Sequence, residues 1–481
     1  MVIVREIIGV LLSVLYVTVV LVISEVYTEK KKNINKENSR KVIHILTAHY
    51  IFIVCFFNHS VWFAAIPSLI FIVINALSKK FNLFKSMERD NSDSFGTIWY
   101  SVSATLVVVF AYSFNIREIA IISILILGYG DGLAALIGIK YGKYKLQTSD
   151  KTFEGSITMF FVTAIIYGTF QYITYGVIDL RLMLSMCVLT TLSEYIATKG
   201  LDNLLIPFTV STILICNHFL PNSTSIIFVT SLIVLFVFLV WLADSLTLSA
   251  CFITVIMMFL VYFSVGVLPL IGIVVFLVSS SIASIPSNVC KNRARQLHKR
   301  NGVRSYIQVL ANGSVTVVLS VIFYFTRLDS IWFGIFVSLA VASSDTFSSE
   351  IGMLSKSAPI SILTFKKTES GLSGGITFLG FLGSLVGASI IGSVVLYSRA
   401  GMFISVVISG VIGSMIDSFI GAALQIKYIT PEGEITEKEF CNGKKLEVYS
   451  GIRWINNDYV NFISILLATF LSVSIYQLLL S

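Results

Sequence analysis

Long uninterrupted apolar segments recur along this chain, and they restrict its fold more than any other feature. Residues 7–23 and 226–242 are two examples, and neither contains a charged residue. A helix of about 20 residues crosses ~30 Å of hydrocarbon. Because the hydrocarbon offers no partner to free backbone groups, such segments span a membrane as helices. The ~10-residue alternating segments of a membrane β-barrel are absent from the sequence. We therefore predict an all-α polytopic membrane protein.

The hydropathy pattern predicts about sixteen transmembrane helices. The composition agrees, with 56% hydrophobic and 12% charged residues, against about 25% charged residues in a soluble protein. The predicted spans are residues 7–24, 43–58, 61–77, 97–114, 118–138, 156–175, 180–198, 204–220, 224–242, 246–263, 266–285, 307–326, 330–351, 374–397, 402–426 and 459–480.

Basic residues alternate between the two sides of the predicted bundle. All but five of the 34 lysines and arginines lie in every second loop. The exceptions are Arg5, Arg117, Arg181, Arg327 and Arg399. Because cytoplasmic loops carry such an excess, we predict a multi-pass protein with its basic loops in the cytoplasm, in the plasma membrane if the source is bacterial. The net charge of +8 then reflects topology and predicts no nucleic-acid partner, and the sequence identifies no protein partner.

Two stretches of the chain echo each other. Both contain an aspartate ending an apolar run, Ile-Gly shortly after it, a Lys-Thr turn ending in glycine, and a later second aspartate. These features occupy residues 131–138, 151–155 and Asp202 in the first stretch, and 345–352, 367–371 and Asp417 in the second. We infer two halves of common origin, residues 1–222 and 223–481.

Carboxylates at the edges of predicted spans are the first functional candidates. An aspartate at mid-bilayer costs ~2.5–3.5 kcal/mol on insertion scales, so such groups need partners. The candidates are Asp131, Glu154, Glu194 and Asp202 in the first half, and Asp345, Glu350, Glu369 and Asp417 in the second. Mg²⁺ prefers one or two carboxylates with substrate phosphates, and the six scattered cysteines form no zinc motif. We predict Mg²⁺ or Mn²⁺ as cofactor, held by Asp131, Asp202, Asp345, Glu350 and Asp417.

Lysines and glycines beside these carboxylates are typical of phosphate binding. Ammonium groups and open backbone amides together form anion-binding sites. Neither half contains a Walker A sequence, so a P-loop fold is not predicted. Phosphoryl transfer nevertheless depends mainly on positioning and charge neutralisation. The candidate groups are Lys143, Lys151, Thr152 and Gly155 in the first half, and Lys366, Lys367, Gly371, Gly374 and Gly375 in the second.

The first half resembles a known family of membrane enzymes over about residues 35–220. The matching residues are Arg40, Lys41, His44, Glu88, Arg89, Ser94 to Ile98, Gly130, Asp131, Gly138 to Lys143, Lys151 to Ser156, Glu194, and Asp202 to Pro207. In this order they resemble the CTP-dependent polyprenol kinases, which include dolichol kinase, phytol kinase and the yeast-type CTP-using diacylglycerol kinase. A single aspartate precedes Asn203 where relatives often carry two.

The second half, about residues 225–481, resembles a different membrane family, which includes the plant phytyl-phosphate kinases. The matching residues are Gln308 to Gly313, Ser343 to Gly352, Thr364 to Lys367, Gly371 to Gly375, Gly413 to Ala422, and Asn456 to Asn461. The pairing implies two steps in series. An isoprenoid alcohol such as phytol, farnesol, geranylgeraniol or a polyprenol becomes a monophosphate, and the second half converts the monophosphate to a diphosphate.

The resemblance also suggests roles for individual residues. In the first half, Asp131 and Asp202, with Glu154, would hold the metal ion on the phosphates of CTP. Nucleotide and phosphate contacts would come from Arg40, Lys41, Arg89, Lys143, Lys151, Thr152, Gly155 and Asn203. His44 would accept the proton of the alcohol. In the second half, Asp345, Glu350 and Asp417 would hold the metal ion, with Lys366, Lys367 and residues 371–375 on the phosphates and Asn312 and Asn461 as polar support.

Three other functions remain open from the sequence. A phosphatidate cytidylyltransferase and a CTP-dependent diacylglycerol kinase would use the same nucleotide, metal ion and membrane setting. A lipid or ion transporter would suit many spans and two repeats, but it predicts charged residues near mid-membrane in broken helices. The carboxylates instead adjoin the basic loops. We therefore favour an enzyme whose partners are a nucleotide and a membrane-held isoprenoid alcohol.

Overall fold

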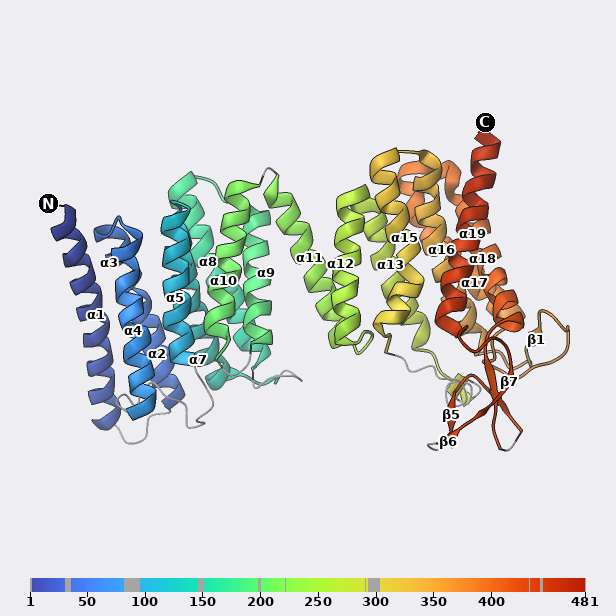
Figure 1. Cartoon of the computed structure of the whole chain (residues 1–481), viewed down its shortest axis with the longest axis horizontal. Helices are drawn as coiled ribbons and strands as arrows, with labels where there is room; N and C mark the ends of the chain where they lie inside the picture. Colours follow the sequence, from blue (N-terminus) through green and yellow to red (C-terminus); the bar gives the residue numbers. More distant parts are fainter. Residues whose placement is uncertain are drawn as a thin grey trace. The chain divides into compact units, whose positions relative to one another are not determined.

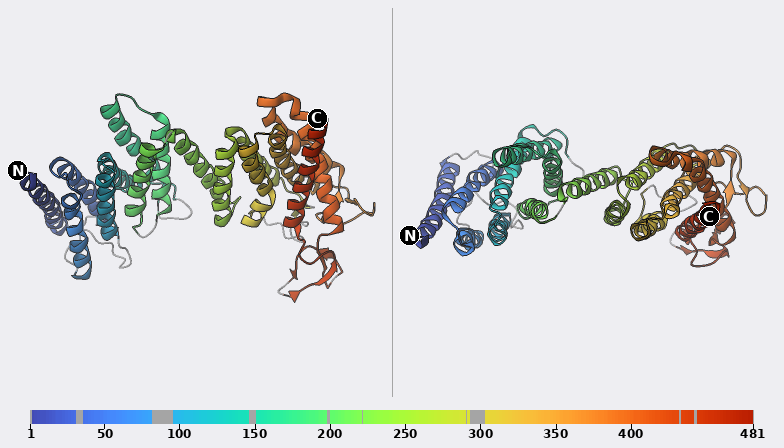
Figure 2. Two further views of the ribbon diagram at one scale, coloured as in Figure 1. Left: turned by 45° about the horizontal axis from the view of Figure 1, so that its top comes forward. Right: turned by 90° about the horizontal axis from the view of Figure 1, so that it is seen from above.

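The computed structural model describes residues 2–30, 36–81, 96–145, 151–197, 200–220, 222–289, 291–292, 303–431, 433–441 and 444–480. It divides into two compact units, Met1–Leu235 and Phe236–Ser481. Each unit is a bundle of helices that run side by side (Figure 1), and Figure 2 shows both bundles from further directions. The division falls within α11 (Ser223–Leu242), the helix whose start lies at the predicted boundary near residue 222.

The first unit consists of helices throughout its described part. A six-residue π-helical stretch, η2, joins α6 to α7, so that these three elements form one continuous helical rod. The elements are α1 (Val2–Lys30), α2 (Lys36–Ala48), α3 (Tyr50–Phe57), α4 (Val61–Phe81), α5 (Gly96–Ser113), α6 (Glu118–Leu125), η2 (Ile126–Asp131), α7 (Gly132–Tyr141), α8 (Phe153–Tyr175), α9 (Leu180–Ile196) and α10 (Asp202–Phe219).

The second unit adds short strands to its helices. The helical elements are α12 (Leu248–Val265), α13 (Val267–Ser284), α15 (Tyr306–Thr326), α16 (Asp329–Gly352), α17 (Phe378–Arg399), the 3-10 turn η3 (Ala400–Met402), α18 (Phe403–Ala423) and α19 (Asn457–Leu480). The strands are β1 (Ile360–Ser361), β2 (Gly375–Ile376), β3 (Lys427–Ile429), β4 (Ile435–Thr436), β5 (Phe440–Cys441), β6 (Lys444–Lys445) and β7 (Glu447–Ser450). The strands lie at the end of this unit opposite the C-terminus of the chain (Figure 1).

The prediction of an all-α polytopic membrane protein is confirmed. Within the described residues, thirteen segments are long and apolar enough to cross a membrane. One of them, Phe378–Ala423, contains both α17 and α18. The helices α9 and α10 fall outside the thirteen, yet both coincide with predicted spans. Every predicted span thus lies on a helical segment of the described chain.

Polar side chains fix where several helices begin. Thr152, Thr247 and Thr377 each accept a hydrogen bond from the backbone N–H three residues later, at the starts of α8, α12 and α17. Ser305 and Gln308 form a reciprocal capping box at the start of α15. Such caps satisfy N–H groups that have no partner inside the helix. The loops before these helices are therefore held at defined positions, and two of the loops carry candidate phosphate-binding residues.

Both units repeat one order of helix packing. In the first, α8 packs on α7 and α9, and α10 packs on α9, α5 and α6. In the second, α17 packs on α16 and α18, and α19 packs on α18, α15 and α16. The series α5 to α10 therefore corresponds to the series α15 to α19, with the rod α6–η2–α7 equivalent to α16.

This correspondence corrects part of the sequence alignment between the halves. Gly138 packs against Thr152, and Gly352, the same distance after its aspartate, packs against Thr377. Thr377, which caps α17, is therefore the structural equivalent of Thr152, which caps α8. The alignment of residues 151–155 with 367–371 was wrong, because an insertion carrying β1 and the glycine loop separates α16 from α17.

The second aspartates were also misaligned. Asp417 lies on α18, which corresponds to α9, so its counterpart is Glu194 rather than Asp202. Asp202 begins α10, and the equivalent start of α19 carries Asn457 and Asp458. Sequence spacing alone could not reveal this, because the insertion before α17 lengthens one half.

Candidate active sites

The first unit gathers opposite charges around two lysines, of which Lys41 is buried and Lys151 is partly exposed. Lys41 of α2 forms an ion pair with Asp131 at the end of η2, and both side chains are almost fully buried. Lys151, in the loop before α8, pairs with Glu194 of α9 at 2.6 Å and lies 3.7 Å from Asp202 at the start of α10. Five segments of the chain thus meet at one charged cluster, which we call the first site.

Close helix packing brings Lys41 to Asp131. A Cβ atom at Gly128 would lie 2.4 Å from the Cβ of Ala48, and one at Gly132 would lie 2.6 Å from Ile45. No side chain fits at these positions, so α2 can approach η2 and α7 closely. Small residues serve this purpose at membrane helix interfaces. The glycines before and after Asp131 therefore set the spacing of the ion pair.

The charge of Lys151 depends on the carboxylates around it. Burial lowers the pKa of this lysine, but the negative charges of Glu194, Asp202 and Asp131 outweigh burial, so its pKa is raised above the ordinary lysine value. Lys151 therefore stays protonated at neutral and moderately alkaline pH. Because the folded state raises the pKa of Lys151, the protonated lysine stabilises the fold. This stabilisation is lost only as the pH rises through the raised pKa.

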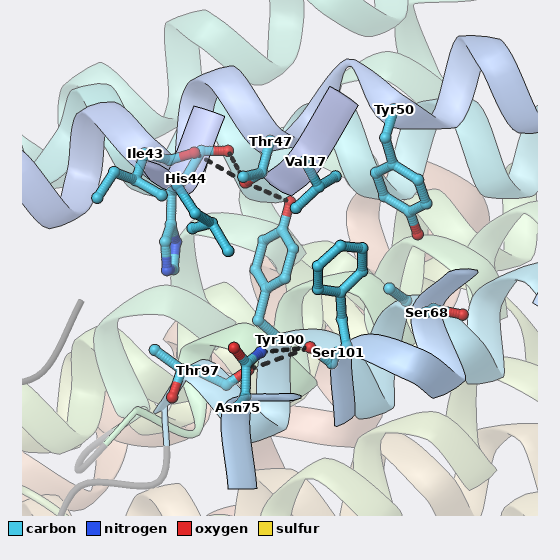
Figure 3. Close-up of a pocket in the computed structure, with 13 residues that line it drawn as sticks. Val17, Ile43, His44, Thr47, Tyr50, Ser68, Asn75, Thr97, Tyr100 and Ser101 are labelled. Atoms are coloured by element: carbon cyan, nitrogen blue, oxygen red, sulfur yellow. Dashed lines mark hydrogen bonds between the residues drawn. The ribbon is translucent and has the colours of Figure 1, made fainter. Parts of the chain in front are cut away.

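An apolar pocket adjoins the first site. It has an empty volume of about 510 Å³ and lies among α1, α2, α3, α4 and α5. His44 and Tyr100 line it, with ring centroids 4.9 Å apart (Figure 3). The Nδ1 atom of His44 lies 3.8 Å from Asp131 and has no hydrogen-bond partner among the described residues. His44 therefore lies between an apolar pocket and the charged cluster.

Several residues predicted for the first site make contacts that organise its backbone. Thr152 caps α8, and Gly155 packs against the carbonyl oxygen of Ala134. Glu154 accepts a hydrogen bond from the backbone N–H of Lys143 at 2.9 Å, and the Lys143 side chain is exposed. These contacts fix the turn that follows α7.

Three further residues were predicted for the first site: Arg40, Asn203 and Arg89. Arg40 is buried and pairs with Glu37. The Asn203 amide nitrogen donates to the carbonyl oxygen of Gly96 at 2.9 Å, while its Oδ1 has no partner among the described residues. Arg89 lies outside the residues that the structure describes.

The second unit has a polar pocket in the equivalent place. Its empty volume is about 630 Å³, and Asp345 of α16 and Asp417 of α18 both line it. Residues 370–375 form another wall, and we call this pocket the second site. Gly374 has a φ of +88°, and a Cβ there would lie 2.4 Å from the Cβ of Ala422. Only glycine combines this conformation with so close an approach.

Neighbouring elements hold the walls of the second site. Glu437, in the segment between β4 and β5, accepts a hydrogen bond from the backbone N–H of Ser373 at 2.9 Å. Ser464 of α19 donates to Oδ2 of Asp417 at 2.8 Å. Asn461 donates to Oδ1 of Asn312 at 3.2 Å. The glycine loop and Asp417 are thus each fixed by side chains from elsewhere in the unit.

Three residues predicted for the second site lie elsewhere. Glu350 forms an ion pair with the fully buried Lys291 at 2.8 Å and is absent from the pocket wall. Lys366 and Lys367 are exposed in the segment between β1 and β2 and do not line the pocket either. The glycine loop, serines and two aspartates, rather than lysines, therefore form the described wall of this site.

The ligand sets bear on the predicted metal ion. Within the described chain, no three His, Cys, Asp or Glu residues gather as a metal cluster. The second site offers two carboxylates with serine hydroxyls and no thiol. Such a set fits a hard cation that takes its remaining ligands from phosphate and water. In the first site, Oε2 of Glu194 is buried without a partner among the described residues, so it too is available to a cation.

Sequence reasoning missed several residues of both sites. Tyr100 and Asn75 line the apolar pocket but lie in ordinary spans with no motif around them. Lys291 had been counted only as a basic loop residue, although it is buried and paired. Ser464 also escaped notice, because one serine in an apolar helix carries no signal.

Comparison with known proteins agrees with this architecture. Residues 231–469 match the family described as integral membrane protein DUF92. The chain is 30% identical over 175 residues to phytol kinase of Synechocystis sp., covering 36% of this chain and 75% of the relative. It is 31% identical over 231 residues to Protein PGR of Arabidopsis thaliana, covering 42% and 78%. It is also 30% identical over 188 residues to an uncharacterized membrane protein of Methanocaldococcus jannaschii, covering 39% and 67%. No solved structure matches the chain.

The helices and the comparisons define the class of this molecule as a multi-pass integral membrane protein. It belongs to the phytol kinase family, and its residues 231–469 belong to the integral membrane family DUF92. Each of these three relatives covers less than half of the chain.

Proposed function

We propose that the first unit transfers a phosphoryl group from CTP to an isoprenoid alcohol, and that the second unit adds another phosphoryl group to the monophosphate. One observation carries the proposal. His44 lies between an apolar pocket and the buried group of Lys41, Asp131 and Lys151. A substrate with a hydrocarbon tail and one hydroxyl matches this arrangement. The similarity to phytol kinase supports an isoprenoid alcohol, and the resemblance to polyprenol kinases supports CTP.

The chemistry of the first step follows from these positions. The alcohol oxygen forms a bond to the terminal phosphorus of CTP. The bond between that phosphorus and the bridging oxygen of CDP breaks, and CDP leaves. His44 takes the proton of the hydroxyl, and Asp131, 3.8 Å from its Nδ1, stabilises the resulting imidazolium. Lys41 and Lys151 offset negative charge on the transferred group. Buried cations are effective here because the low dielectric strengthens their attraction for phosphate.

A divalent cation, when bound, would offset negative charge on the phosphates in both units. Asp131 and Asp202 would hold it in the first site, and Asp345 and Asp417 in the second. In the second site the glycine loop at 371–375 would cradle phosphate with backbone N–H groups, as glycine-rich turns do elsewhere.

Labelled nucleotides test the proposal directly. Membranes containing the full chain are incubated with a panel of prenols and either γ-labelled or α-labelled CTP, and lipid products are identified by mass spectrometry. We expect the γ label in prenyl monophosphate and diphosphate. Transfer of the α label to phosphatidate would instead indicate a cytidylyltransferase, and γ label in phosphatidate would indicate a diacylglycerol kinase. Absence of transfer with either label would contradict all three enzyme assignments.

A matched variant pair assigns the activity to the first site. Asp131→Asn should abolish labelling of the prenol, because it removes the partner of Lys41 and the carboxylate beside His44. Asp244→Asn is the control, since Asp244 is an exposed turn residue with a φ of +51°, a conformation that asparagine tolerates. Equal activity in both variants would remove Asp131 from the mechanism.

A further inference from the structure

A second apolar pocket lies in the second unit, apart from the polar pocket of Asp345 and Asp417. It is formed by α12, α13, α15 and α16, and it has an empty volume of about 510 Å³. Its walls are mainly hydrocarbon, including Met258, Phe276, Leu277 and Leu339. We call it the tail pocket.

One arginine supplies the charge of the tail pocket. Arg304 lines it, and the guanidinium lies over the ring of Phe276 at 5.8 Å from the centroid. No hydrogen bond or ion pair of this guanidinium is recorded among the described residues, although the carboxylate of Glu350 attracts it. Burial lowers the pKa of Arg304, and Glu350 opposes that effect. A permanently charged, partly exposed group beside an apolar cavity is suited to an anion.

The backbone of Arg304 is anchored on both sides. Its N–H donates to the carbonyl oxygen of Ser245, and its carbonyl oxygen accepts from the N–H of Thr247, both at 3.0 Å. Ser305, the next residue, caps α15 through its reciprocal bonds with Gln308. The guanidinium therefore projects from a fixed point between the α11–α12 turn and the start of α15, which makes it a prepared position for binding.

A chain of contacts links the tail pocket with the second site. Asn312 lines the tail pocket, and its Oδ1 accepts from Asn461. The hydroxyl of Ser464 lies 3.0 Å from the carbonyl oxygen of Asn461 and 2.8 Å from Oδ2 of Asp417. Asp417 lines the polar pocket. α15 lines the tail pocket and α19 lines the second site, and these hydrogen bonds connect the two helices and Asp417 of α18.

We propose that the tail pocket binds a single-chain lipid phosphomonoester, with hydrocarbon between the helices and the phosphate on Arg304. This inference rests on the proposed function, in which such a monophosphate is the substrate of the second unit. An apolar tail matches the walls, and a phosphate dianion matches the guanidinium, which can bind phosphate through two parallel hydrogen bonds.

Binding of geranylgeranyl monophosphate to the purified full-length protein in detergent tests the proposal without nucleotide. Arg304→Gln should weaken binding about ten-fold or more, since it removes the charge-assisted hydrogen bonds to phosphate. Gly313→Leu should also weaken binding, because the leucine side chain fills the pocket that Gly313 lines. The helix can accept a side chain there, since the atom nearest to a Cβ at Gly313 is the flexible end of Met257. Arg327→Gln is the control, as Arg327 stacks on Phe323 and Tyr324 at the other end of α15. Unfolding transitions of all variants establish that they are folded.

Competition experiments show which part of the monophosphate the site recognises. Inorganic phosphate and geranylgeraniol should each compete at least ten-fold less well than the monophosphate. Equal competition by inorganic phosphate would reduce the site to a simple anion site, and equal competition by phosphatidate would identify a two-chain lipid. Either result, or unchanged binding by Arg304→Gln, overturns the proposal. If the protein transferred no phosphoryl group but its binding of the monophosphate depended on Arg304, only the proposed function would be wrong. If it transferred the group but binding did not depend on Arg304, only this inference would be wrong.

Discussion

The two units place an aspartate on equivalent helical rods but surround it differently. Asp131 is buried against Lys41, with Lys151 and its carboxylates nearby. Asp345 instead faces an open pocket bounded by the glycine loop and by Asp417. The first site thus surrounds its aspartate with lysine side chains, whereas the glycine loop and a second carboxylate line the second site. The difference teaches that the insertion between α16 and α17, rather than the helices, supplies the distinctive wall of the second site.

The largest expected effect tests whether Asp417 is the counterpart of Glu194. Asp417→Asn should lower conversion of prenyl monophosphate to diphosphate by about 100-fold or more, the size seen when a group that stabilises transition-state charge is lost. Conversion of the alcohol to monophosphate should stay unchanged. The two steps are measured separately, with prenol or prenyl monophosphate supplied to membranes.

Glu194→Gln should give the reverse pattern, with the first step reduced and the second intact. The structural reason is that Glu194 is the 2.6 Å partner of Lys151, so its loss changes how that lysine is held. If Glu194→Gln and Asp417→Asn impaired the same step, the correspondence of α9 with α18 would have no functional meaning.

Glycine at position 374 should be essential to the second step only. Gly374→Ala forces an alanine into a left-handed conformation and against Ala422, a strain on the order of 1–3 kcal/mol that distorts the loop. We expect a loss of about ten-fold or more in the second step. Gly176→Ala is the matched control, because Gly176 also has a positive φ, +72°, but nothing lies within 4 Å of its would-be Cβ. Similar losses in both variants would show that backbone strain alone, rather than the loop, matters.

The smallest effect concerns the exposed lysines. Lys366→Gln with Lys367→Gln should change the second step by less than about three-fold, because screened surface charges contribute little and neither side chain lines the pocket. In contrast, Lys151→Gln should strongly reduce the first step. A loss above ten-fold in the double variant would restore the role that the sequence predicted for these lysines and would weaken the contrast between the two sites.

Much of the fold could be read from the sequence because each span is a local feature. The segment 330–351, for example, was predicted as a span and forms α16 (Asp329–Gly352). The aspartates at 131, 202, 345 and 417 were likewise visible, since an acid at the edge of an apolar run is conspicuous. The apolar pocket beside His44 was not visible, because it is made from five helices whose residues are individually ordinary.

The sequence by itself determined the membrane class, the helices and the acidic residues on which the two sites depend. Only the tertiary structure decided which groups meet: Lys41 with Asp131, Lys151 with Glu194, and Asp417 with the glycine loop. The physical reason is that hydropathy acts within one helix, whereas an ion pair or pocket requires a particular packing of several helices. An insertion in one half, such as the one before α17, shifts sequence spacing without altering that packing.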